Sequence, residues 1–166
     1  MNWANTLWIG IAASTFMSIL IVVGLLHNPR ISLHSFPDVI QDAVPPKTVG
    51  EKRLTAIYGI GTILALLIVP ITYATIYGAE SYATIWIHVF AIAMIFNVVD
   101  LVLIDWLLIC LLTPKWTIVP GTENPPAYDG YKDYGFHLVG FLKGVIFCAV
   151  LPTVVTCIAF VANLGS

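Results

Sequence analysis

The chain has 166 residues, of which 59% are hydrophobic and 10% are charged, and its mean hydropathy is +0.93. These values lie far outside the range of a soluble domain and predict an integral membrane protein. The net charge of -2 comes from both signs without a basic patch, which excludes a nucleic-acid partner. The three cysteines lie inside apolar runs, at spacings that fit neither a metal site nor a disulfide framework.

Four apolar runs are long enough to cross a bilayer as helices. They cover about 7–26, 54–77, 82–112 and 136–164. Strands of a membrane barrel would be shorter, more numerous and alternately polar, so helices are the better way to satisfy the backbone in lipid. The sequence therefore predicts an all-α integral membrane protein, a single domain over residues 1–166 built as a bundle of four transmembrane helices.

The connection between the first two runs contains an amphipathic segment at about 36–44. Its apolar residues recur with helical spacing and share one face: Phe36, Val39, Ile40, Ala43 and Val44. Ser35 and Asp38 have the spacing of a cap, and two prolines end the segment. Because the opposite face is acidic, we expect a short interfacial helix that packs on the protein's own helices rather than on anionic lipid.

Local signals mark helix ends and helix contacts. Thr48 and Glu51 have the spacing of a capping box at the start of the second run. Pro70 and Pro152 lie at similar depths in the second and fourth runs, where each frees a backbone carbonyl. Small residues predict close helix packing in the first and fourth runs: Gly10, Ser14, Ser18, Gly140 and Gly144.

The third run contains three polar side chains, Asn97, Asp100 and Asp105. As an α-helix, its length of about 46 Å exceeds the roughly 30 Å of the hydrocarbon core, so it must tilt or protrude. A carboxylate at membrane depth costs about 2.5–3.5 kcal/mol on insertion scales, so it requires a partner, a water-filled cavity or a proton. With α-helical spacing the three side chains spread over about 140°.

Basic residues predict the orientation. All seven lysines and arginines fall in, or close to, the two long connections: Arg30, Lys47, Lys52, Arg53, Lys115, Lys132 and Lys143. Cytoplasmic loops carry this excess, so both long loops are expected in the cytoplasm and both termini outside, in the plasma membrane.

This orientation places the ionisable groups in the cytoplasmic half of the bundle. Asn97, Asp100 and Asp105 would meet His137 and Lys143 of the fourth run. A turn at Pro120–Gly121 would direct Glu123 toward the same mouth. We expect these residues to form a polar pocket that faces the cytoplasm and binds a ligand or handles protons.

Three functions fit such a pocket. The first is binding or movement of a small solute or lipid-like ligand, with a carboxylate that exchanges a proton for a cation, in a homo-oligomer or beside a membrane partner protein. The second is an enzyme acting on an amphiphile at the inner leaflet with Asp and His chemistry. A metal would need His27, His34 and His137 to converge without a motif, and haem is less favoured still. The third is a non-catalytic accessory or assembly subunit with a structural Asp–Lys pair.

Overall fold

The computed structural model describes residues 2–76 and 81–164. It is 83% helical, and no strand occurs among the described residues, so the predicted all-helical class is confirmed. Four helical segments are long and apolar enough to cross a membrane. They are α1 (Trp3–His27), α3 (Val49–Ile76), α4 (Tyr82–Val99) with its continuation η2 (Asp100–Leu112), and α6 (Tyr134–Leu164).

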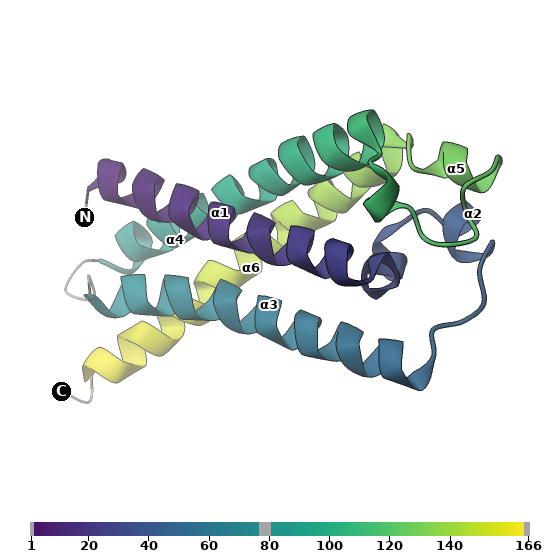
Figure 1. The fold of residues 1–166 in the computed structure, drawn as a ribbon. Helices are drawn as coiled ribbons and strands as arrows, with labels where there is room; N and C mark the ends of the chain where they lie inside the picture. The colour runs from purple at the N-terminus through teal and green to yellow at the C-terminus, as the bar shows by residue number, and fades with distance from the viewer. Residues whose placement is uncertain (1, 77–80, 165–166) are drawn as a thin grey trace.

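The two termini lie at one end of the molecule and the two long connections lie at the other (Figure 1). Helix α4 has extensive contacts with α1 on one side and α6 on the other, whereas α3 has smaller contacts with each of its neighbours. No described residue in the apolar window of α3 is buried. Helix α3 is therefore the least firmly packed of the long helices.

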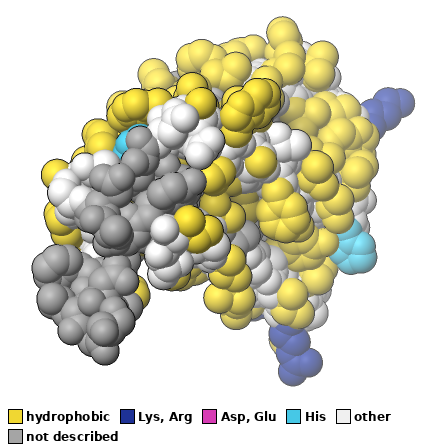
Figure 2. Space-filling model, turned by 90° about the vertical axis from the view of Figure 1, so that its left-hand side faces the viewer, with side chains coloured by type: hydrophobic (Ala, Val, Ile, Leu, Met, Phe, Trp, Pro, Cys, Tyr) yellow, Lys and Arg dark blue, Asp and Glu magenta, His cyan; other side chains and the backbone are white. Residues whose placement is uncertain are grey.

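Viewed from the end with the termini, the described side chains are mainly hydrophobic and no Asp or Glu is visible (Figure 2).

Two apolar clusters hold the structure together. The first joins α4 to α6 through Ile85, Val89, Ile92, Ala93, Cys148, Leu151 and Val155. The second joins the two long connections to the ends of α1 and η2 through Leu25, Leu33, Phe36, Ile40, Val44, Ile109, Val119 and Tyr131. The Tyr131 ring is fully buried there, and its hydroxyl accepts a 2.8 Å hydrogen bond from the Val119 amide. The two connections thus form one packed cap over the end of the bundle.

The first connection differs from its prediction. It contains a 3-10 helix, η1 (Pro29–Ser35), followed by a single turn, α2 (Asp38–Gln41). The expected helix over 36–44 is wrong in extent because Phe36 and Pro37 are extended, and no side chain caps α2. The predicted apolar face packs inward in part, since Phe36, Ile40 and Val44 are buried, whereas Val39 and Ala43 are exposed.

The second connection contains a 3-10 turn, η3 (Lys115–Thr117), and a single helical turn, α5 (Ala127–Gly130). Gly130 lies against α2, where a Cβ atom would collide with Val39 and Ile40. A side chain at this position would therefore separate α2 from α5 and open the cap.

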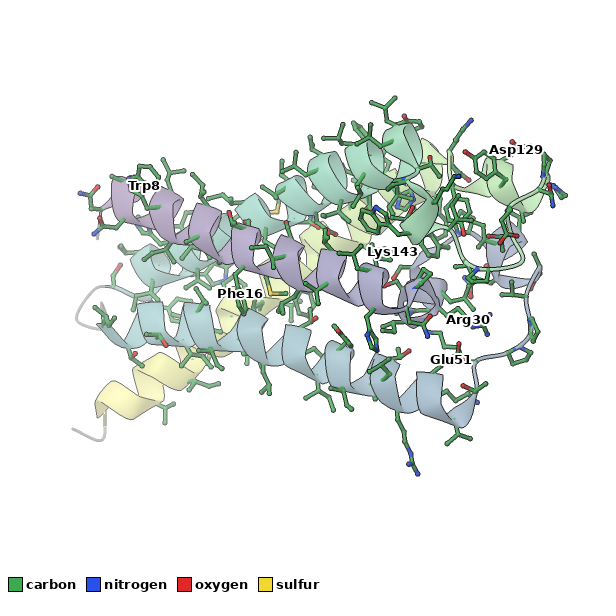
Figure 3. All side chains as sticks on the ribbon, viewed as in Figure 1. Trp8, Phe16, Arg30, Glu51, Asp129 and Lys143 are labelled. Carbon is green, nitrogen blue, oxygen red and sulfur yellow. The ribbon has the colours of Figure 1, made fainter. Side chains whose placement is uncertain are left out.

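The start of α3 agrees with its prediction. The Thr48 amide donates to Glu51 Oε2 at 2.7 Å, and the Glu51 amide donates to Thr48 Oγ1 at 3.2 Å, which completes the capping box. Arg30 Nε also donates to Glu51, which ties η1 to α3 at the cap end (Figure 3). Helix α6 continues through Pro152. The side chain of Pro70 lies outside the described residues.

Small residues allow close contact at Gly10 and Gly144. A side chain at Gly10 would collide with Ile95 of α4, and one at Gly144 would collide with the amide of Asn97. Gly140 instead has no atom within 4 Å of a hypothetical Cβ. The predicted packing role therefore holds for Gly144 and not for Gly140.

This difference predicts unequal effects of adding a methyl group. We expect Gly144→Ala to push α4 away from α6 and to lower the free energy of unfolding by about 1–3 kcal/mol, as overpacking of a close contact does. Gly140→Ala is the matched control and is expected to be near neutral. Thermal unfolding of both variants in the same detergent tests the difference, and equal melting temperatures would contradict the close contact.

Candidate functional site

The polar segment of the third long helix is not α-helical. At Asp100 the helix α4 changes to a π-helix, η2, which continues to Leu112. The Thr113 amide extends this pattern with a 3.0 Å hydrogen bond to the Leu108 carbonyl, five residues earlier. π-helices are usually single turns and often occur at functional sites, so a segment of 13 residues is unusual.

The π-helix changes which side chains share a face. With hydrogen bonds between residues five apart, Asp100 and Asp105 lie about one turn apart on nearly the same face. With α-helical spacing they would lie about 140° apart. The expectation of α-helical spacing is therefore wrong in this segment, and the two carboxylates line the same cavity.

The end of the π-helix is held in an unusual conformation. Thr113 has φ 38° and ψ 57°, in the left-handed region that a β-branched residue rarely adopts. Its hydroxyl donates a 2.8 Å hydrogen bond to the Ile109 carbonyl, and the residue is buried. Such a conformation persists only where the surroundings enforce it, so packing of the cap fixes the end of η2.

A polar cavity of about 300 Å³ lies between η1, the α4–η2 helix and α6. Its ionisable and amide side chains are Asp100, Asp105, His34, His137 and Asn97. Phe136 and Phe141 contribute aromatic walls. A smaller adjoining cavity of about 140 Å³ shares Ser35, both aspartates and His137. Among the described residues, no lysine or arginine lines either cavity.

Asp105 and His137 form the central contact of this cavity. His137 Nδ1 lies 3.0 Å from Asp105 Oδ1, and the His137 side chain is 4% exposed. Its other ring nitrogen, Nε2, has no hydrogen-bond partner among the described residues. A carboxylate next to Nδ1 favours the tautomer with a proton on Nδ1, which leaves the lone pair of a neutral ring on Nε2.

Asn97 and His34 form other walls of the polar cavity. The Asn97 side-chain amide donates a 3.2 Å hydrogen bond to the Phe141 carbonyl, so it attaches α4 to α6. Burial and the nearby Lys47 ammonium lower the pKa of His34 below its usual value of 6.5. Lys47 itself donates to the Ile31 carbonyl at 2.7 Å. The His34 ring is therefore neutral at neutral pH and adds no positive charge to the cavity.

The structure does not place Lys143 in this site. Lys143 is exposed and, among the described residues, forms no ion pair with Asp100 or Asp105. The predicted Asp–Lys pair is wrong, because Gly144 faces α4 and the residue before it points away from the helix contact. His137 is the partner of Asp105 instead.

Other candidates are also distant from the polar cavity. The Glu123 carboxylate is exposed and accepts hydrogen bonds of 2.9 and 3.0 Å from the Gly121 amide within its own turn. His27 is exposed at the end of α1, whereas His34 and His137 line the same cavity. Within residues 2–76 and 81–164, no three His, Cys, Asp or Glu side chains lie close enough to share a metal ion.

An apolar cavity that sequence reasoning missed lies in the middle of the bundle. It has a volume of about 440 Å³ and is lined from α1, α3, α4 and α6. Phe16 lies between α1 and α3 at its wall (Figure 3). A third cavity, of about 360 Å³, shares Leu20 with the apolar cavity and shares His34 and Ser35 with the polar one. The third cavity therefore adjoins both of the others, and α3 lines the third cavity and the apolar one.

These features define a class: an all-helical chain with four long apolar helices, a polar cavity between η1, the α4–η2 helix and α6, and an apolar cavity in the middle of the bundle. No protein-family model, curated protein or solved structure matches the chain. The argument for its function therefore depends on the chemistry of the cavities.

The lowered pKa of His34 predicts a specific pH dependence. Because the folded state disfavours the protonated ring, stability is unaffected above the unfolded pKa of 6.5 and is lost as the pH falls below it. Between about pH 8 and about pH 5, the wild type should lose more thermal stability than His34→Gln. His27→Gln is the matched control for removal of an imidazole outside the cavities. Identical pH dependence in wild type and His34→Gln would contradict the burial of the ring.

Proposed function

We propose that this chain is a multi-pass membrane protein that binds an amphiphile with a cationic head group. The head group would lie in the polar cavity beside Asp100 and Asp105, and its hydrocarbon chain would lie in the apolar cavity. The adjoining cavities carry this proposal, because their lining changes from carboxylates and imidazoles to hydrocarbon along one path. A fully polar ligand would leave the apolar cavity unfilled.

Charge supports a cation over an anion. Two carboxylates line the polar cavity, and the lysine or arginine that recognises phosphate or carboxylate is absent from its described lining. Phe136 and Phe141 offer aromatic faces, which attract cations. A cationic head group would also offset the cost of keeping carboxylates within an apolar helix.

Access from the lipid is supported by the packing of α3. None of the described residues in its apolar stretch is buried, and the third cavity lies between α3, α1 and η1. A hydrocarbon chain would enter sideways between these helices, which requires no second copy of the protein.

Orientation follows from the positive-inside rule, by which both long connections would be cytoplasmic. The polar cavity would then lie near the inner leaflet, and an ammonium ion would compete with protons for the two carboxylates. Proton-coupled exchange of the ligand is the corresponding mode of action.

An enzyme is the second candidate. The Asp105–His137 contact orients a ring nitrogen that could act as a general base, as a carboxylate does for histidine in hydrolases. Release of a product from a bound amphiphile would distinguish this candidate from binding alone.

The proposal predicts selective binding of cations. The full chain in phosphatidylcholine nanodiscs would be titrated calorimetrically with dodecylammonium and with laurate, which share a tail length, and empty nanodiscs would be subtracted. We expect dodecylammonium to bind at least about tenfold more tightly, and Asp100→Asn to weaken it by about tenfold, or about 1.4 kcal/mol.

The matched control is Glu123→Gln, which removes an exposed carboxylate outside the cavity and should leave binding unchanged. Equal affinities for dodecylammonium and laurate, or an unaffected Asp100→Asn variant, would contradict a cationic head-group site.

A further inference from the structure

We infer that the head group carries an N–H bond, and that His137 Nε2 accepts a hydrogen bond from it while Asp105 sets the tautomer of the ring. This inference rests on the proposed function and narrows its ligand to a primary, secondary or tertiary ammonium. A quaternary ammonium, which has no N–H, would be a poor ligand.

The first support is the orientation of the ring. Asp105 Oδ1 lies 3.0 Å from His137 Nδ1, and a carboxylate accepts but does not donate. The Nδ1 proton is therefore committed to Asp105. A neutral ring then presents an acceptor at Nε2, and protonation would turn that nitrogen into a second donor.

The second support is the condition of Nε2. The His137 side chain is 4% exposed and lines both polar cavities, yet Nε2 has no partner among the described residues. An unsatisfied buried acceptor costs about 1–3 kcal/mol. Within the described part of the chain, three other buried side-chain atoms have no partner, and they belong to Ser18, Trp106 and Thr156. None of these three residues lines the polar cavities.

The third support is the set of groups that face the ring. Asp100 and Asp105 approach from η2, and His34 approaches from η1. An ammonium in this space would meet the negative charge of Asp100 and the acceptor Nε2 together. Asp105 touches the ring rather than the ligand in this arrangement, so it is a positioning residue.

The test compares two cations with the same tail. Dodecylammonium and dodecyltrimethylammonium would be titrated into the full chain in phosphatidylcholine nanodiscs. We expect the wild type to prefer dodecylammonium by about tenfold or more. His137→Phe, which keeps a ring of similar size, should lose this preference.

A spectroscopic measurement keeps the inference falsifiable if His137→Phe fails to fold. In the wild type labelled with ¹⁵N-histidine, the His137 signals should show a neutral ring with its proton on Nδ1. Dodecylammonium should shift the Nε2 signal, and dodecyltrimethylammonium should not. Asp105→Asn should change the tautomer and reduce the preference between the two cations.

The outcomes separate the two proposals. Equal binding of both cations, each tighter than laurate, would overturn the role of Nε2 and leave the cationic site standing. Binding of neither cation above laurate would overturn the site itself. A proton found on Nε2 in the wild type would overturn the assignment of Asp105 and His137.

Discussion

A carboxylate inside an apolar helix needs a partner, and the contact of Asp105 with His137 supplies it. The contact joins η2 to α6 across the polar cavity, at 3.0 Å and with the imidazole almost fully buried. The π-helix makes it possible for Asp100 to share the same face. Asn97 and Gly144 bring α4 and α6 together nearby, so the two helices are held at the distance that this contact requires. The site is therefore a consequence of how α6 packs on the α4–η2 helix.

Helix α3, in contrast to α6, is packed loosely against the rest of the bundle. Whereas α4 and α6 pack together through a buried apolar cluster, no residue described in the apolar stretch of α3 is buried, and α3 adjoins two of the three cavities. The capping box and the Arg30–Glu51 contact nevertheless hold its first turn at the cap. A helix anchored at one end and loosely packed along its length is suited to let a hydrocarbon chain pass.

Composition and local patterns were sufficient for the coarse structure. Long apolar runs predicted the four helices, and Thr48 with Glu51 predicted where α3 begins, because these depend on nearby residues only. The partner of Asp105 depends on which face of α6 is turned toward the α4–η2 helix. Gly144 lies at that contact, whereas Lys143, one position earlier, lies on the surface. The apolar cavity arises from packing between segments that are distant in the sequence, and no local pattern in the sequence predicts the π-helix. Orientation in a membrane remains a prediction from the lysines and arginines.

The central claim is that one amphiphile occupies the polar and apolar cavities together. The direct measurement is photocrosslinking of the full chain in nanodiscs with a dodecylamine that carries a diazirine at the end of its tail. The account predicts labelling of buried residues at the apolar cavity, such as Met17 and Ile92, and loss of that labelling when unlabelled dodecylammonium is added. Labelling that resists competition and spreads over exposed positions such as Ile57 and Val161 would contradict it.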